Sequence, residues 1–333
     1  MAANNSSSLD MLDVNFNTTM DEDPTGITGY LILYVTLMGI VSCIGVPGNI
    51  LILVAVLTNK NLRRLSNVLI VNLAVADLLI TSINVPFAIV GALHPNVLFK
   101  FPSLCTAIGA ISVTTCGCSI WTIMSISLDR YLHICHPNFP SLLTRRTVPV
   151  IMACPWLIGF ALDLPNFLTW GSHGYELSSR RCTYETNTYA YNIYLYVVGA
   201  VIPTLIVPYC YLRIYLSVRR SNRSLQSAKH GGAQNQDVRL LKTVFTIWVL
   251  FTLMWNPHGV YILLGEFYIW PYWLVMISVA LAYTNSCINC IIYGIVHKNF
   301  RQSFVQIFRK ICHRHSGQGS ARHQTNSAVD CTT

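Results

Sequence analysis

Long segments without charged residues recur along the chain and predict transmembrane helices. A helix needs about 20 apolar residues to cross the roughly 30 Å hydrocarbon core of a bilayer. Five segments contain no Asp, Glu, Lys or Arg, namely 27–59, 101–128, 186–212, 243–265 and 267–297. Two others, 65–99 and 147–168, each contain a single Asp. The segments lack the two-residue alternation of barrel strands, so the sequence predicts an all-α membrane protein with a seven-helix transmembrane bundle.

The composition supports this fold class. Hydrophobic residues make up 53% of the 333 residues and charged residues only 11%, and the mean hydropathy is +0.48. Soluble globular proteins contain about 25% charged residues. Too few charges are present to cover a water-exposed surface, so the composition excludes a cytosolic enzyme.

The distribution of basic residues predicts the orientation in the membrane. The first 26 residues contain five acids and no Lys or Arg, whereas three basic residues occur within 60–64. With the N-terminus outside, only Lys100, Arg180 and Arg181 of the 22 basic residues lie on the outer side. We therefore expect a multi-pass plasma-membrane protein with a cytoplasmic C-terminus. The net charge of +9 then faces anionic lipid and cytosolic partners, and nucleic acid is not an expected partner.

The predicted spans divide the chain into four parts. We expect an extracellular tail at 1–26 and the transmembrane bundle at 27–297. An amphipathic helix on the membrane surface is expected at 298–312, and a disordered cytoplasmic tail at 313–333. Asn4, Asn5 and Asn17 each begin an N-x-Ser/Thr sequon in the first part. These three residues are predicted glycosylation sites.

Segment 298–312 is predicted to lie along the inner leaflet, because apolar residues follow helical spacing among basic ones. The apolar residues are Phe300, Phe304, Ile307, Phe308 and Ile311. Cys312 follows directly and is a predicted palmitoylation site, with an unmodified cysteine as the alternative. Membrane lipid is therefore an expected partner.

Asp77 is the most informative polar residue, because it lies well inside the second predicted span. A charge at that depth costs about 2.5–3.5 kcal/mol on insertion scales. Ser119, Asn285 and Asn289 lie at similar apparent depth and offer further oxygens. Two interpretations remain open: a protonated or hydrogen-bonded packing residue, and a cation or proton site.

The tripeptide Asp129-Arg130-Tyr131 lies at the cytoplasmic end of the third predicted span. It is an interfacial anchor in one interpretation, with the Arg reaching toward the interface and the Tyr at the headgroups. Taken alone it does not distinguish that role from a functional one.

Prolines within the fifth and sixth predicted spans indicate places where the helices bend. Pro203 and Pro257 each remove a backbone donor and disturb the preceding turn. Trp255, two residues before Pro257, is placed to pack in the core above that bend, and ordinary core packing is its alternative role.

Short motifs occur in all seven spans in a consistent order. They are Gly48-Asn49, Leu73-Ala74-Val75-Ala76-Asp77, Asp129-Arg130-Tyr131, Trp156, Pro203, Tyr211, Trp255-Asn256-Pro257 and Asn289-Cys290-Ile291-Ile292-Tyr293. Together, in this order and spacing, they resemble the rhodopsin-like, class A G-protein-coupled receptors. The resemblance covers roughly residues 27–312.

Local strings make the chain similar to the melatonin receptors within that family. They are Tyr211-Leu212-Arg213-Ile214, Gln236-Asp237, Ile134-Cys135-His136, Asn285-Ser286-Cys287, Ile291-Ile292-Tyr293-Gly294 and Asn299-Phe300-Arg301. Among the departures from the melatonin-receptor pattern are Asp129, where the pattern has Asn, and Cys290, where it has Ala.

The resemblance implies a ligand pocket with no charged side chain. Its expected lining is Ser112, Cys116, Asn166, Tyr184, Trp255, His258 and Tyr283. Ser112 occupies the position where amine receptors carry an Asp, and Tyr283 the position where opsins carry a Lys. We expect a small, partly aromatic, uncharged ligand or a short peptide. For His258, a core histidine with one hydrogen bond is an equally supported alternative.

Melatonin itself is a disfavoured agonist by the same comparison. Asn166 matches the pattern, and Tyr184 can stack on an indole ring. Thr186, Gly199 and Gly259 replace the pattern's Gln, His and Asn, and each lost hydrogen bond costs roughly 0.5–1.5 kcal/mol. The two glycines are also expected to enlarge the pocket. We expect a micromolar response or none, and a different small aromatic ligand.

The resemblance also implies how a signal crosses the membrane. Arg130, Tyr211 and Tyr293 are expected to help form a cavity for a heterotrimeric G protein. Likeness to melatonin receptors implies the inhibitory class, and arrestin is a further expected partner. Arg130 is expected to pair at rest with Asp129 and with Asp237. The receptor itself performs no bond chemistry, so it is not predicted to be an enzyme.

Two further sites are expected. Cys105 and Cys182 are the two of 12 cysteines most clearly on the oxidising outer side, which predicts a disulfide between them. The family arrangement implies a sodium ion, as an allosteric modulator, held by Asp77, Ser119, Asn285 and Asn289. No other cofactor is expected.

Other functions remain as alternatives. A receptor for a different ligand, such as a short peptide, and a non-signalling decoy both retain the fold. A transporter would need a path of intramembrane charges, and only Asp77 is central. The sequence contains no H-E-x-x-H or G-x-S-x-G motif that would indicate an intramembrane enzyme.

Overall fold

The computed structural model is built mainly of helices in the part of the chain that it describes. That part comprises residues 24–139, 142–168, 170–185, 188–224, 232–265, 267–297 and 299–310. The predicted glycosylation sites Asn4, Asn5 and Asn17 and the predicted palmitoylation site Cys312 lie outside it. The side chain of Asp237 also lies outside the described part.

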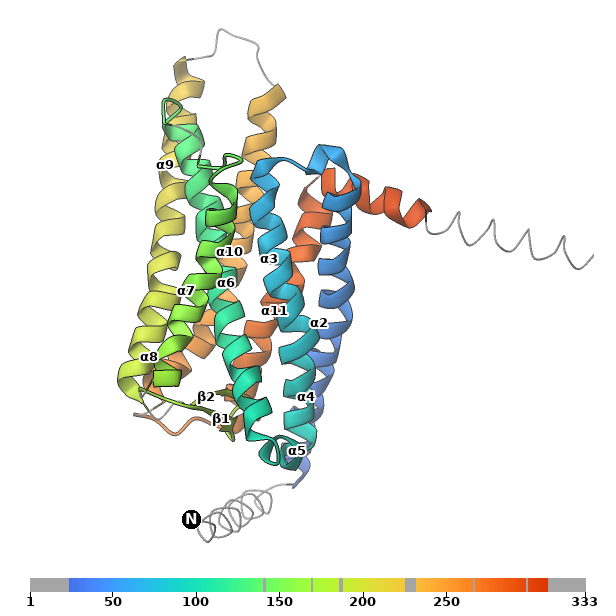
Figure 1. Ribbon diagram of the computed structural model, residues 1–333, viewed down its shortest axis with the longest axis vertical. Helices are drawn as coiled ribbons and strands as arrows, with labels where there is room; N and C mark the ends of the chain where they lie inside the picture. Colours follow the sequence, from blue (N-terminus) through green and yellow to red (C-terminus); the bar gives the residue numbers. More distant parts are fainter. Residues whose placement is uncertain are drawn as a thin grey trace, which may run out of the picture.

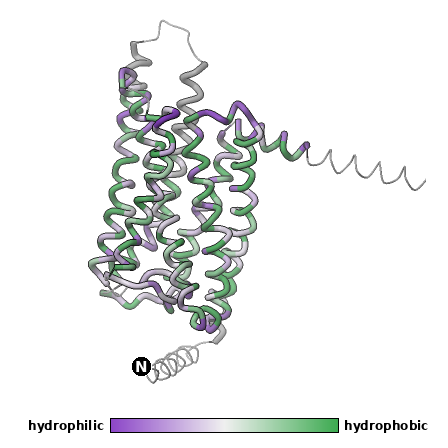
Figure 2. Tube along the Cα trace, in the orientation of Figure 1, coloured by the Kyte–Doolittle hydropathy of each residue, from purple (hydrophilic) through white to green (hydrophobic). Residues whose placement is uncertain are grey.

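Helices lie side by side in one bundle, and hydrophobic residues run along most of their length (Figures 1 and 2). They are α2 (Pro24–Thr58), α3 (Val68–Leu79) continued by η3 (Ile80–Asn84) and α4 (Val85–Leu93), α6 (Pro102–Cys135), α7 (Val148–Leu168), α8 (Tyr189–Tyr196) continued by η4 (Val197–Val201) and α9 (Ile202–Ser224), α10 (Gly232–Leu264) and α11 (Tyr272–Val296). Among the described residues, six helices are long and apolar enough to cross a membrane. Residues 243–264 of the remaining predicted span lie in α10, so each predicted span contains helical residues.

Short elements connect the spans. They are η1 (Lys60–Leu62), η2 (Leu65–Asn67), α5 (Pro95–Phe99), and the antiparallel strands β1 (His173–Glu176) and β2 (Arg181–Tyr184). The β1–β2 hairpin lies at the end of the bundle where α2 begins (Figure 1). A further helix over 299–310 leaves the bundle at the opposite end. We call these the hairpin end and the opposite end.

Two π-helical turns interrupt the second and fifth spans, and each comes just before a proline. The turn η3 precedes Pro86, and η4 precedes Pro203. A proline lacks an N–H, and its ring clashes with the carbonyl four residues earlier, so the preceding turn must rearrange. The interruption predicted at Pro203 takes this form, whereas Pro257 lies within the continuous helix α10.

Small residues allow some helices to approach closely. A Cβ atom on Gly159 of α7 would lie 2.3 Å from the carbonyl oxygen of Thr114 in α6. A Cβ atom on Gly48 of α2 would lie 2.3 Å from the sulfur of Cys290 in α11. Such contacts give van der Waals packing where lipid removes most of the hydrophobic drive for association.

Candidate functional site

A disulfide between Cys105 of α6 and Cys182 of β2 attaches the hairpin to the bundle, as the sequence predicts. Both cysteines are buried together with Leu98. Tyr175, which pairs with Cys182 across the hairpin, donates a hydrogen bond to the carbonyl of Gly91 at 2.6 Å. Burial raises the pKa of the Tyr175 phenol, so it remains a neutral donor. The hairpin is therefore fixed to both α6 and α4.

A cavity of about 190 Å³ lies against the inner side of β2. Its walls come from α6, α7, the α8–η4–α9 span, α10, α11 and β2. Six residues predicted to bind ligand line it: Ser112, Cys116, Tyr184, Trp255, His258 and Tyr283. Burial raises the pKa of Tyr184, so its phenol also stays neutral.

Arg181 makes the cavity positively charged, and the expectation of a neutral pocket is wrong. Its side chain lines the cavity, and the residue is only 8% exposed. Nη1 donates to the hydroxyl of Tyr283 at 2.9 Å, and Nη2 lies 3.2 Å from Nε2 of His258. The distribution of basic residues places Arg181 on the outer side of the membrane but does not indicate which way its side chain points. In the sequence, only its position next to Cys182, which is bonded to α6, indicates that Arg181 lies close to the bundle.

His258 is hydrogen-bonded through both ring nitrogens. Its Nδ1 lies 3.3 Å from the hydroxyl of Ser278, and that hydroxyl donates to the carbonyl of Val275 at 2.7 Å. Because Ser278 has one hydrogen and donates it to Val275, it accepts from Nδ1–H of His258. Nε2 is then free to accept from Arg181. His258 is therefore more than a core histidine with one hydrogen bond, since it orients the arginine.

The space next to Gly259 is already filled. A Cβ atom on Gly259 would lie 2.3 Å from the ring of Tyr196, which also lines the cavity. The expectation that this glycine enlarges the pocket is wrong. Tyr196 was not among the predicted lining residues.

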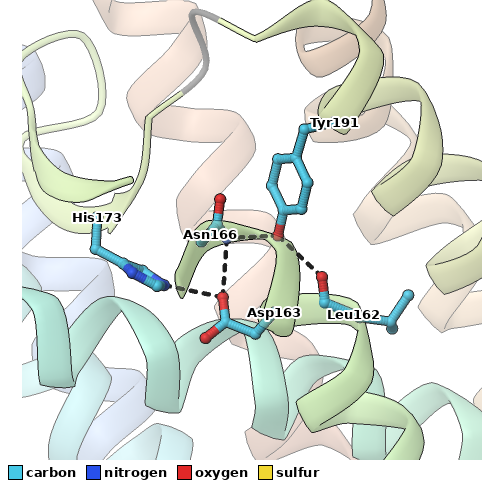
Figure 3. A network of polar contacts seen from close by, with 5 residues as sticks. All are labelled: Leu162, Asp163, Asn166, His173 and Tyr191. Carbon is cyan, nitrogen blue, oxygen red and sulfur yellow. Dashed lines mark hydrogen bonds and ion pairs between the residues drawn. The ribbon is translucent and has the colours of Figure 1, made fainter. Parts of the chain in front are cut away.

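Asn166 lies outside the cavity lining and belongs to a separate polar network (Figure 3). Its Nδ2 atom donates to Oδ1 of Asp163 at 3.0 Å and to the hydroxyl of Tyr191 at 2.7 Å. His173 of β1 also reaches Oδ1 of Asp163, at 2.9 Å. This network joins α7 to α8 and to the hairpin, which accounts for a polar residue at a position expected to contact ligand.

Asp77 is fully buried between α3, α6 and α11. Asn289 donates to its Oδ2 at 2.7 Å, and Ser119 lies 3.4 Å from its Oδ1. Within the described part of the chain, the Oδ1 atoms of Asn285 and Asn289 are buried and have no hydrogen-bond partner. The oxygen of Asn289, whose amide nitrogen bonds to Asp77, is of the type that a small hard cation prefers.

An ion pair lies at the opposite end of the bundle. Nη2 of Arg130 is 2.6 Å from Oδ2 of Asp129, and both side chains are less than 10% exposed. Tyr131 lies on the next position, with its hydroxyl 3.0 Å from Nε2 of His136. A charge-assisted hydrogen bond of this length holds Arg130 along α6.

Two tyrosines predicted to contact a G protein pack in the largest buried cluster. Tyr293 belongs to that cluster and stacks near Phe300, with ring centroids 5.6 Å apart. Tyr211 packs against the same cluster and contacts Phe245, with centroids 5.1 Å apart. The hydroxyl of Tyr293 is buried and has no hydrogen-bond partner among the described residues, whereas the hydroxyl of Tyr211 lies next to Ser127.

No group of three or more His, Cys, Asp or Glu side chains in the described ranges is arranged to hold a metal ion. A sodium ion at Asp77 would be held by one carboxylate and neutral oxygens instead.

The architecture is that of a helical transmembrane receptor. It combines membrane-length helices, a cavity next to an anchored hairpin and a charged pair at the opposite end. The family model described as "7 transmembrane receptor (rhodopsin family)" matches residues 48–293. The chain therefore belongs to the rhodopsin family of seven-transmembrane receptors, whose members act through G proteins and are not enzymes.

Individual relatives agree with this assignment. The chain is 30% identical over 276 residues to melatonin receptor type 1B-B of Danio rerio, covering 80% of this chain and 79% of the relative. It is 29% identical over 280 residues to melatonin receptor type 1A of Mus musculus, covering 81% and 78%. The crystal structure of squid rhodopsin has the same fold, with a TM-score of 0.75, 24% identity, and coverage of 84% and 87%. The chain is thus a G-protein-coupled receptor of the plasma membrane, similar to melatonin receptors.

Proposed function

We propose that a small molecule bound in the cavity is the agonist, and that its binding alters the opposite end so that a heterotrimeric G protein binds there. The observation that carries this proposal is the cavity itself. It is enclosed by aromatic and aliphatic side chains with a few placed polar groups, the usual composition of a ligand site.

A packed path connects the two ends. Trp255 lines the cavity and stacks on Phe251, with ring centroids 5.7 Å apart. Phe251 lies in the same buried cluster as Tyr293 and Phe300. We expect a ligand that displaces Trp255 to repack this cluster through a swing of α10 at Pro257. Signalling requires two helix arrangements for which ligand and G protein have different affinities.

We also propose that the hairpin end faces the outside. The scarcity of basic residues on that side supports this orientation. The disulfide at the same end supports it as well, because such bonds persist in oxidising compartments. The four-part division at 1–26, 27–297, 298–312 and 313–333 follows from this orientation.

The helix over 299–310 supports membrane lipid as a partner. Phe300 is fully buried against the bundle, whereas Phe308 is 57% exposed. An exposed aromatic residue on a short helix beside basic residues suits the interface of the inner leaflet. Palmitoylation at Cys312 would add a second anchor next to this helix.

Asp77, Ser119, Asn285 and Asn289 are proposed to hold a sodium ion in the resting receptor. The buried, unpaired oxygens of the two asparagines support this assignment. The ion would link α3, α6 and α11, so a rearrangement of these helices would release it.

Asp129, Arg130, Tyr131, Tyr211 and Tyr293 are proposed to form the G-protein site. Likeness to melatonin receptors favours a G protein of the inhibitory class, and the same surface would serve arrestin. Melatonin itself is expected to act weakly or not at all. Asn166, the residue that would hydrogen-bond it by analogy, is engaged by Asp163 and Tyr191 instead.

Loading of a GTP analogue onto purified G protein by the reconstituted receptor tests the proposal. A panel of indoleamines and other small aromatics should include a compound that accelerates loading, and Arg130→Ala should reduce that effect. A compound that binds the cavity but accelerates loading of no G-protein class would support the decoy alternative instead.

A further inference from the structure

We propose that the cavity recognises a ligand carrying a carboxylate, which forms an ion pair with Arg181. The inference rests on the proposed function, because it names the chemical class of the agonist. It is carried by a buried guanidinium that faces the cavity without a negative partner.

Arg181 has more hydrogen-bond donors than the protein satisfies. A guanidinium carries five N–H groups. One on Nη1 bonds to Tyr283 and one on Nη2 to His258, and Nε is buried without a partner. The donors that remain suit a carboxylate, which can accept two parallel hydrogen bonds from one guanidinium.

The charge of Arg181 also lacks a counter-charge. Among the residues that the structure describes, no carboxylate lies within ion-pair distance of it. The buried acid Asp163 is engaged by His173 and Asn166. A guanidinium stays charged at any physiological pH, and a buried charge is stable only when it is paired. Glu176, which is paired with Arg181 across the hairpin, accepts a hydrogen bond from Ser178 and forms no ion pair with Arg181 in the described part of the chain, so a counter-charge can approach from the cavity.

The two neutral partners of Arg181 hold it in place without neutralising it. Tyr283 accepts from Nη1, and its hydroxyl lies 3.2 Å from Oγ of Ser112. His258 accepts from Nη2 because Ser278 fixes its other nitrogen. Arg181 is thus oriented before ligand arrives, which lowers the entropy cost of binding.

The rest of the cavity indicates an apolar body for the ligand. Its walls include Ile120, Leu162, Phe251, Trp255 and Ile262. An engineered cavity of about 150 Å³ binds benzene, so the volume of about 190 Å³ admits one ring with a short chain. A small arylalkanoic acid has both an apolar ring for this space and a carboxylate for Arg181.

Matched acid and amide probes test the proposal. We would measure the thermal unfolding of the purified, lipid-reconstituted receptor with 3-phenylpropanoate or with 3-phenylpropanamide at neutral pH and constant ionic strength. The two probes have the same shape and differ in charge. The acid should bind about tenfold or more tightly than the amide, because hydrogen bonds between charged groups are stronger than neutral ones.

Variants assign the preference to one side chain. Arg181→Gln should bring acid and amide to equal affinity. Arg180→Gln should keep the preference, because Arg180 donates to the carbonyl of Ala92 and does not line the cavity. Wild-type receptor that responds no more to the acid than to the amide overturns the proposal, even when Arg181→Gln fails to fold. A preference that survives in folded Arg181→Gln overturns it as well.

Parallel GTP-analogue loading separates this proposal from the proposed function. Acid-selective binding without loading would support the carboxylate and count against signalling. Equal loading by acid and amide would overturn the carboxylate and leave the signalling function standing.

Discussion

At the scale of single residues, two adjacent arginines have side chains in very different surroundings. Arg180 is half-buried and bonds to the backbone of α4, whereas Arg181 lines the cavity. Hydropathy assigns both to the same loop, because it does not encode which way a side chain points. Only the pairing of Tyr175 with Cys182 and the disulfide to Cys105 settle that direction.

Six of the seven residues predicted to bind ligand line the cavity, and Asn166 is the exception. Ser112, Cys116, Trp255 and Tyr283 lie on helices, so their positions along each helix were enough to place them. Asn166 lies near the end of α7, where local partners decide its direction, and Asp163 and Tyr191 lie within hydrogen-bond distance.

Replacing Asp77 tests the sodium site. In the wild type, agonist affinity should fall when sodium replaces a bulky cation such as choline at constant ionic strength. Asp77→Asn removes the only carboxylate of the proposed ion site and should abolish this response. Radioligand competition in the two salts measures it, and a sodium effect that persists in Asp77→Asn would exclude the assignment.

Removing Asp163 tests the network of Figure 3. Asp163→Ala takes away the acceptor shared by His173 and Asn166. Each buried donor that finds no other partner costs about 1–3 kcal/mol, so the unfolding temperature should fall. Ser82→Ala, which removes an exposed hydroxyl, is the control and should change stability by less than about 0.5 kcal/mol. Equal unfolding temperatures for the two variants would contradict a stabilising role for the network.

At the scale of elements, the membrane made the helices predictable and left the hairpin unpredicted. A spanning helix satisfies its own backbone, so its sequence alone indicates it, and the predicted span 267–297 contains α11. The strands β1 and β2 have four residues each, and an isolated two-stranded hairpin is marginally stable. Its stability here comes from the disulfide and from His173, which are contacts distant in sequence.

Two glycines in transmembrane helices provide a matched test of close packing. A Cβ atom on Gly159 would meet Thr114, whereas one on Gly39 of α2 would meet nothing within 4 Å. Alanine is favoured over glycine inside helices by about 0.5–1 kcal/mol. Gly39→Ala should therefore be neutral or stabilising, and Gly159→Ala should destabilise because overpacking costs about 1–3 kcal/mol. Thermal unfolding of both variants measures this, and destabilisation of similar size in both would argue against a special contact at Gly159.

At the scale of the whole molecule, polar sites divide the bundle into levels. Arg181 and its partners lie at the hairpin end, Asp77 and Asn289 lie within the bundle, and Asp129 with Arg130 lies at the opposite end. Apolar clusters fill the space between them. Arg181 bonds to Tyr283 and Asp77 bonds to Asn289, and both partners belong to α11, so a shift of α11 changes the contacts of both sites. This arrangement supports coupling between a ligand and a G protein.

Two acidic residues are expected to hold Arg130 in the resting state at the opposite end. Arg130 is held by Asp129 at 2.6 Å, and Asp237 at the foot of α10 is the expected second partner. Because Arg130 keeps its bond to Asp129, we expect a bond to Asp237 to add only about 1 kcal/mol to the stability of the resting arrangement. Asp237→Ala should therefore raise basal GTP-analogue loading by a few-fold, since 1.4 kcal/mol corresponds to about tenfold. Arg130→Ala should instead lower agonist-stimulated loading, because it removes a group proposed to contact the G protein. Asp330→Ala, another acidic residue expected on the cytoplasmic side, is the control and should leave basal loading unchanged. Basal loading in Asp237→Ala equal to that of the wild type would show that the bond to Asp129 is enough to hold Arg130 at rest.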